Sequence, residues 1–230
     1  MERFIPGSGT NAETVRQHMA RYEFAAAYVK GKCLLDVACG AGYGSSILKE
    51  AGAQRVYGVD VSEEAISYAR AHYASPDLTF IAGNAEDLRC PEKVDVVVSF
   101  ETIEHLGQPD RFFAGVVRCL SDPGLAIIST PIRRKGSLED RPANPYHLRE
   151  WNQAEFTDML GKYFREVTLF GQYNYETRWY PYSRRIRMIL SKALAPAAYD
   201  DLVAFHVRAQ APSKPRARFA MEFGVAVCLK

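Results

Sequence analysis

The chain has 230 residues, about one and a half times the size expected of a single domain, and its 47% hydrophobic and 24% charged residues exclude intrinsic disorder. The 29 Lys and Arg residues and 27 Asp and Glu residues give a net charge of +2, which excludes a histone-like polycation but not a local basic patch. No apolar run approaches the roughly 18 residues that a membrane-spanning helix needs, and the N-terminus lacks a signal-peptide pattern. The five cysteines form no C-x-x-C pair, which argues against a disulfide framework or structural zinc, so we expect a reduced, cytoplasmic protein.

Predicted helices and strands alternate along the chain. A first helix begins at a capping-box pattern of Thr10 and Glu13 and carries apolar residues at helical spacing to Val29. Strands are predicted at 33–37, 55–59, 78–81, 94–100, 125–129, 165–170 and 219–228. Helices are predicted through Ile47 and Leu48 to Gly52, after the cap Ser62, from Phe112 to an end near Pro123-Gly124, and from the Asn152/Glu155 cap through Tyr163. This alternation predicts an α/β, Rossmann-like, mostly parallel sheet with helices on both faces and ligands at the carboxyl ends of the strands.

The strongest local motif is LLDVACGAGYG at residues 34–44. Asp36 stands near the end of the first strand, and three glycines crowd the turn into the next helix, where they let the backbone approach a ligand closely. Asp60 closes the second strand, where a carboxylate can accept hydrogen bonds from both hydroxyls of a ribose. The motif therefore predicts a nucleotide-containing cofactor.

Two cofactors fit such a loop. A dinucleotide site has the pattern G-x-G-x-x-G, but Ser45 stands in place of the third glycine here. A pyrophosphate gains nothing from the nearby Asp36 anion, whereas a cationic sulfonium with an α-amino group does. The residues thus favour S-adenosylmethionine (SAM) over NAD. The alternative is a glycine turn that merely packs.

Four segments in order resemble class I SAM-dependent methyltransferases over roughly residues 30–170: the glycine loop, VYGVDVS (56–62), IAGNAEDL (81–88) and VDVVVSFETIEHL (94–106). The resemblance implies a seven-stranded sheet whose last strand is antiparallel. It places Asp36, Ala38, Gly40 and Gly42 at the methionine end of SAM, Asp60 at the ribose, Val61, Asn84 and Ala85 around the adenine, and Phe100 beside the cofactor. The family often has Asp where Asn84 stands, although an amide still offers an acceptor to the adenine amine.

The first 30 residues are expected to form a cap over this site. His18, Arg21 and Tyr22 are candidates to face the cofactor or the acceptor, and Tyr22 is assigned to the cofactor. The alternative is that Tyr22 only packs in the apolar stripe of its helix.

A candidate metal site follows the fourth strand as E-x-x-E-H, formed by Glu101, Glu104 and His105. If a helix has begun by Glu101, these positions share one face, and a mixed oxygen and nitrogen set suits a divalent cation. His147 stands in a loop after the fifth strand that returns to the same edge of the sheet.

This set resembles that of metal-dependent O-methyltransferases. The plant small-RNA 2′-O-methyltransferases carry E-x-x-E-H and then a histidine shortly before an E-W pair, which here is Glu150-Trp151, and ubiquinone-biosynthesis O-methyltransferases are related. The resemblance implies that Glu101, Glu104, His105 and His147 bind Mg²⁺ or another divalent cation, with His105 and His147 as catalytic residues. His147 could instead act as a general base. Many metal-free members also carry Glu-His here, which leaves a metal-free site as the alternative.

The last two predicted strands are separated by residues 171–218, far more than the usual hairpin loop. The segment begins with the aromatic run YNYETRWYPY and carries nine Lys and Arg against two Asp between 178 and 218. It could stack on and pair with a nucleotide-sugar or lipid-linked glycan, stack the bases of single-stranded RNA, or form a solvated lid.

The sequence therefore predicts one class I methyltransferase domain over 1–230, with a cap at 1–30 and a basic insertion at 171–218. We expect O-methylation of a hydroxyl on a small polar acceptor, foremost a sugar or glycan. The segments ERFIPGSG, RYEFAA and NPYHLREW resemble bacterial methyltransferases of glycan biosynthesis. An RNA 2′-O-methyltransferase and a non-catalytic SAM-binding protein are the alternatives.

Overall fold

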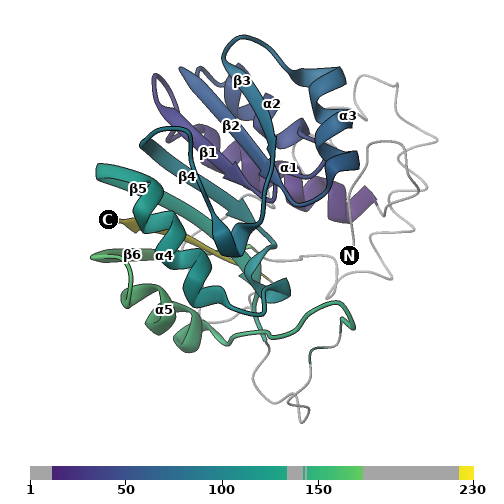
Figure 1. Ribbon diagram of the computed structural model, residues 1–230. Coiled ribbons are helices and arrows are strands. Elements are labelled where there is room, and N and C mark those ends of the chain that lie inside the picture. The colour runs from purple at the N-terminus through teal and green to yellow at the C-terminus, as the bar shows by residue number, and fades with distance from the viewer. Residues whose placement is uncertain (1–11, 134–141, 143, 173–222) are drawn as a thin grey trace, which may run out of the picture.

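The computed structural model describes residues 12–133, 142, 144–172 and 223–230. They form a seven-stranded sheet of order β3-β2-β1-β4-β5-β7-β6 (Figure 1). The strands are β1 (Cys33–Val37), β2 (Arg55–Asp60), β3 (Leu78–Ala82), β4 (Val94–Phe100), β5 (Leu120–Pro131), β6 (Glu166–Gln172) and β7 (Phe223–Leu229). Strand β7 runs antiparallel to both of its neighbours, β5 and β6, and the other strand pairs of the described sheet are parallel, so the predicted sheet is confirmed.

The helices are α1 (Ala12–Ala26), α2 (Tyr43–Glu50), α3 (Glu63–Tyr73), α4 (Pro109–Cys119) and α5 (Gln153–Gly161). Two of the predicted caps are present: the Ser62 hydroxyl accepts from the backbone N–H of Ala65, and Asn152 and Glu155 form a reciprocal capping box. No helix among the described residues is long and apolar enough to cross a membrane.

Two apolar cores cover the two faces of the sheet. Phe112 and Phe113 of α4 pack with Phe156 of α5 on one face, and α1, α2 and α3 pack on the other (Figure 1). The central strands are buried on both sides, which explains the nearly continuous apolar run of β4. This layering leaves the carboxyl ends of the strands as the edge where polar side chains can gather.

Several predicted boundaries differ from the structure. The helix predicted to run to the Pro123-Gly124 turn ends at Cys119, because Leu120 already pairs with Val94 and β5 begins there, before a register shift in the β4–β5 ladder. Strand β7 is described from Phe223 only. The predicted cap residue Thr10 and nearly all of the insertion lie outside the described residues.

Candidate active site

The glycine loop joins β1 to α2 through backbone that a side chain tolerates poorly. Gly42 has φ +86°, and a Cβ there would lie 2.7 Å from the Ala69 Cβ and 2.8 Å from the Phe80 ring. A Cβ on Gly44 would meet the Tyr22 ring at 2.0 Å. The glycines therefore let α1 and β3 close tightly around the loop.

Asp60 lies beside this loop, as the order of the strands requires. Its carboxylate accepts hydrogen bonds from the backbone N–H of Gly40 at 2.9 Å and of Ser62 at 2.8 Å. The next residue, Val61, is an apolar side chain that is 55% exposed. A carboxylate followed by an exposed apolar side chain is the pair expected to hold a ribose and cover an adenine.

Asn84 and Ala85 follow β3 at the same edge. The Asn84 side-chain oxygen accepts from the backbone N–H of Glu86 at 2.8 Å and caps the short 3-10 helix Ala85–Asp87. The oxygen predicted to meet the adenine amine is thus engaged by the backbone in this structure.

Asp36 is fully buried at the end of β1, where Tyr22 of α1 reaches it. The carboxylate accepts from the Ser45 hydroxyl at 2.6 Å, and the Tyr22 hydroxyl lies 3.3 Å from both of its oxygens. Burial raises the pKa of Asp36 to about 7, although the bonds from Ser45 and Tyr22 oppose the rise. The Tyr22 ring also packs edge-on against Phe100, with centroids 5.0 Å apart. Tyr22 therefore both packs, as the alternative had it, and contacts the carboxylate assigned to the methionine end.

Binding of S-adenosylhomocysteine (SAH) should weaken as the pH falls through 7, by up to about tenfold per pH unit. The raised pKa means that Asp36 in the free protein holds a proton below that pH, and an ammonium group beside it binds only the ionised form. Calorimetric titration of SAH across about pH 5.5 to 8.5 measures this slope. Asp36→Asn should remove it and Asp158→Asn on α5 should keep it; a wild-type affinity independent of pH would contradict the assignment.

Glu104, His105 and His147, three of the four residues predicted to bind a metal, form a cluster. One ligand atom of each lies within 4.8 Å of the others, and the two imidazole centroids are 5.0 Å apart. Glu104 and His105 belong to the short 3-10 helix Ile103–His105 after β4, and His147 comes from the loop before α5. The backbone N–H of Leu148 donates to the Glu104 carbonyl at 2.8 Å, which holds that loop in place.

Both imidazoles are oriented by partners at Nδ1. The Nδ1 of His105 lies 2.9 Å from the Tyr146 carbonyl oxygen, and the Nδ1 of His147 lies 2.7 Å from Glu150 Oε1. An N–H at Nδ1 that donates to these oxygens leaves the lone pair on Nε2, which is the arrangement found behind metal-binding histidines. The Nε2 of His147 already lies 3.0 Å from the side-chain nitrogen of Asn144, so a metal there would displace that amide.

The Glu104 carboxylate is 0% exposed. Its Oε2 accepts from the Thr130 hydroxyl at 3.2 Å, but its Oε1 has no hydrogen-bond partner among the described residues. Burial, followed by the nearby charge of Glu101, raises the pKa of Glu104 well above its usual range. A buried carboxylate oxygen without a donor beside two oriented imidazoles fits a divalent cation.

Glu101 does not lie with these three side chains. The condition for a shared face, a helix that has begun by Glu101, is not met: Glu101 has φ +53° directly after β4, and the 3-10 helix starts at Ile103. Its backbone N–H and carboxylate both bond Ser129, whose hydroxyl donates to Glu101 Oε1 at 2.7 Å. These bonds to β5 turn Glu101 away from the face that a helix would share with Glu104.

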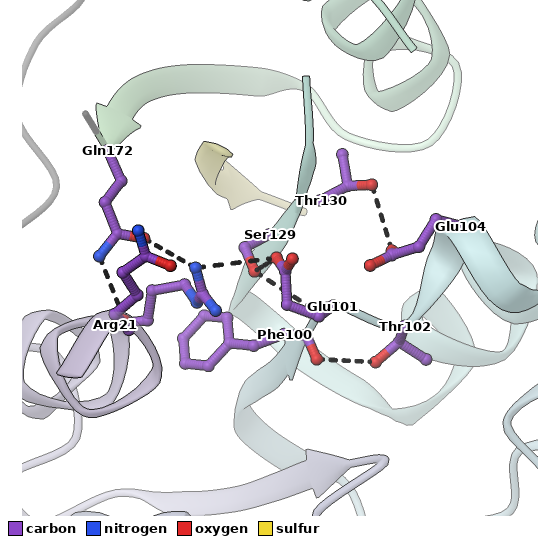
Figure 2. A network of polar contacts seen from close by, with 9 residues as sticks. Arg21, Phe100, Glu101, Thr102, Glu104, Ser129, Thr130 and Gln172 are labelled. Carbon is purple, nitrogen blue, oxygen red and sulfur yellow. Dashed lines mark hydrogen bonds and ion pairs between the residues drawn. The ribbon is translucent and has the colours of Figure 1, made fainter. Parts of the chain in front are cut away.

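Arg21 joins α1 to the ends of three strands (Figure 2). The side chain is 1% exposed; one terminal nitrogen donates to Gln172 Oε1 of β6 at 2.7 Å and lies 3.9 Å from Glu101 Oε1. The guanidinium stacks over the Phe223 ring of β7 at 4.6 Å. The sequence named Arg21 as a candidate but offered no partners for it; Gln172 and Ser129 were missed, although polar residues near the carboxyl ends of strands were a usable signal.

A cleft of about 680 Å³ borders the loop that carries His147. Its lining includes Glu150, the carboxylate that orients His147, together with Trp151 and residues of α5. Glu104, His105 and His147 are not among its lining residues, so the cleft meets the cluster only through Glu150.

Several known proteins are similar to this chain in sequence. Residues 35–128 match the family model of the methyltransferase domain. A probable SAM-dependent methyltransferase of Mycolicibacterium smegmatis is 38% identical over 161 residues, which cover 69% of this chain and 62% of that protein. A fatty-acid O-methyltransferase of the same species is 32% identical over 132 residues, covering 56% of this chain and 44% of that protein. The alignment thus spans less than two thirds of both relatives.

Solved structures of methyltransferases have a similar fold. A TehB-like SAM-dependent methyltransferase from Corynebacterium glutamicum superposes with a TM-score of 0.57 at 19% identity, over 92% of this chain and 87% of that one. The chain therefore contains a class I SAM-dependent methyltransferase domain.

Proposed function

We propose that the chain is a SAM-dependent O-methyltransferase that acts on a hydroxyl of a polar acceptor with the help of a divalent cation. The observation that carries the metal is the buried Oε1 of Glu104 beside His105 and His147, which has no hydrogen-bond partner in the part of the chain that the structure describes. In this proposal Asp36 holds the ammonium of SAM and Asp60 the ribose, so that the methyl group is aimed toward the end of β4.

The metal ligands would be Glu104, His105 and His147, with Glu101 as a fourth once it leaves Ser129. A divalent cation such as Mg²⁺ supplies Lewis acidity that lowers the pKa of an acceptor hydroxyl. Thr130 holds Glu104, Glu150 holds His147, and the Tyr146 carbonyl holds His105 in orientation. The same His147–Glu150 pair, 2.7 Å apart, would serve a general base if no metal is required.

We propose a sugar or glycan as the acceptor. Polar side chains stand at or beside the ends of β4, β5 and β6, among them Glu101, Thr130 and Gln172, and such groups suit a ligand rich in hydroxyls. The fatty-acid O-methyltransferase among the relatives supplies a different acceptor, a fatty-acid carboxylate. RNA is the third acceptor, and the basic insertion that would favour it lies largely outside the described residues.

One assay separates these functions. SAH formation from SAM is measured with panels of sugars and glycans, phenols, fatty acids and short RNAs, after metal removal with EDTA and after Mg²⁺ or Mn²⁺ is restored. The proposal expects turnover of a hydroxylated polar acceptor that EDTA abolishes and added cation restores. Full activity without metal would overturn the proposal that a cation takes part. Turnover of fatty acids alone would overturn the proposed sugar or glycan acceptor. SAM binding with no turnover of any acceptor would point to a non-catalytic protein.

Glu150→Gln should weaken divalent-cation affinity about 10- to 100-fold, because the amide no longer draws the Nδ1 proton of His147 as strongly. Mn²⁺ titration followed by electron paramagnetic resonance measures the change. Glu166→Gln on β6, which is 61% exposed and binds Arg165, is the matched control. An unchanged Mn²⁺ affinity in Glu150→Gln would argue against His147 as a ligand.

A further inference from the structure

We propose that Arg21 couples metal binding to cofactor binding, because Glu101, the proposed fourth metal ligand, now lies against Arg21. The inference rests on the proposed function. Arg21 and Tyr22 are consecutive residues of α1: Arg21 lies 3.9 Å from Glu101, and Tyr22 lies 3.3 Å from Asp36 at the glycine loop. One helix thus contacts both ends of the site.

Glu101 Oε1 accepts from the Ser129 hydroxyl and lies 3.9 Å from Arg21. Its partner Ser129 and the Glu104 partner Thr130 are consecutive residues of β5, so one strand holds both carboxylates. A cation held by Glu104 would attract the Glu101 carboxylate. Glu101 also has the left-handed backbone, φ +53°, of a residue held in place by its surroundings.

If Glu101 bound the metal instead, the Arg21 guanidinium would lose its negatively charged partner. Its side chain is 1% exposed, its Nε has no hydrogen-bond partner among the described residues, and Gln172 is neutral. A buried guanidinium without a counter-charge is costly, so it would favour an incoming carboxylate.

The cofactor carries such a group. Arg21 directly precedes Tyr22 on α1, and the Tyr22 ring packs edge-on against Tyr43, the first residue of α2, with centroids 5.7 Å apart. The amino-acid end of SAM bears an ammonium for Asp36 and a carboxylate for Arg21. Arg21 is thus a positioning residue that is released toward the cofactor when the metal takes Glu101.

Reciprocal calorimetry tests the coupling in the full chain. SAH is titrated in EDTA and in saturating Mn²⁺, and Mn²⁺ is titrated with and without SAH. The wild type should bind SAH at least about fivefold more tightly in the presence of Mn²⁺. SAH should increase the affinity for Mn²⁺ by the same factor. Decarboxylated SAM should show no such gain; a gain equal to that of SAH would mean that Arg21 does not bind the cofactor carboxylate and would overturn this assignment.

Three variants complete the test, with circular dichroism as the check of folding. Arg21→Gln should bind both ligands without coupling, whereas Arg165→Gln, which also removes one exposed positive charge, should couple like the wild type. Glu101→Gln should bind SAH more tightly already in EDTA, because the amide offers Arg21 no charge. Mn²⁺ that binds the wild type without changing its SAH affinity would overturn the coupling and spare the proposed function, whereas a wild type that binds no Mn²⁺ would overturn both.

Discussion

Replacing Glu104 with Gln is expected to weaken Mn²⁺ binding by at least about 100-fold while SAH affinity in metal-free buffer stays unchanged. The amide keeps the size of the side chain and can still accept from Thr130, but it removes the negative charge that faces His105 and His147. Since burial raises the pKa of Glu104 well above its usual range, the neutral variant should fold at least as stably as the wild type.

Mn²⁺ titration followed by electron paramagnetic resonance measures this loss, with thermal unfolding recorded in parallel. Glu166→Gln serves as the matched change on an exposed carboxylate. If the Glu104→Gln protein binds Mn²⁺ as tightly as the wild type, Glu104 is not a metal ligand and the proposed site is wrong.

Gly42→Ala is expected to lower the free energy of unfolding by about 2–5 kcal/mol and to abolish detectable SAH binding. The methyl group would need a left-handed backbone at φ +86° and would press on the Ala69 Cβ and the Phe80 ring. Both effects destabilise the turn that joins the cofactor-binding loop to α2.

Urea unfolding and SAH titration measure the two effects. Gly161→Ala at the end of α5 is the control, because no atom lies within 4 Å of a Cβ built there, so its stability should match the wild type. Equal stability of the two alanine variants would show that the loop does not need this conformation.

Two central strands of the sheet were predictable to the residue. The bounds of β1 and β4 match the predicted 33–37 and 94–100, because a strand covered on both faces shows an uninterrupted apolar run. The start of β5 was missed, since Leu120 reads as the next apolar position of α4 and only its pairing with Val94 makes it extended.

The candidate site likewise contains some contacts that the sequence predicts and others that it does not. The meeting of the glycine loop with Asp60 follows from adjacent parallel strands, and so does the approach of His147 to His105. The backbone of Glu101 depends on Ser129, and Arg21 depends on Gln172, 151 positions along the chain. Such contacts join separate elements and leave no periodic trace in the sequence.

The most direct test of the metal-assisted site is a crystal structure of the chain with SAH and Mn²⁺, with anomalous data collected at the manganese absorption edge. The proposal predicts SAH density between the glycine loop and Asp60, and one anomalous peak bounded by Glu104, His105 and His147. SAH density without a peak at those three side chains would contradict it.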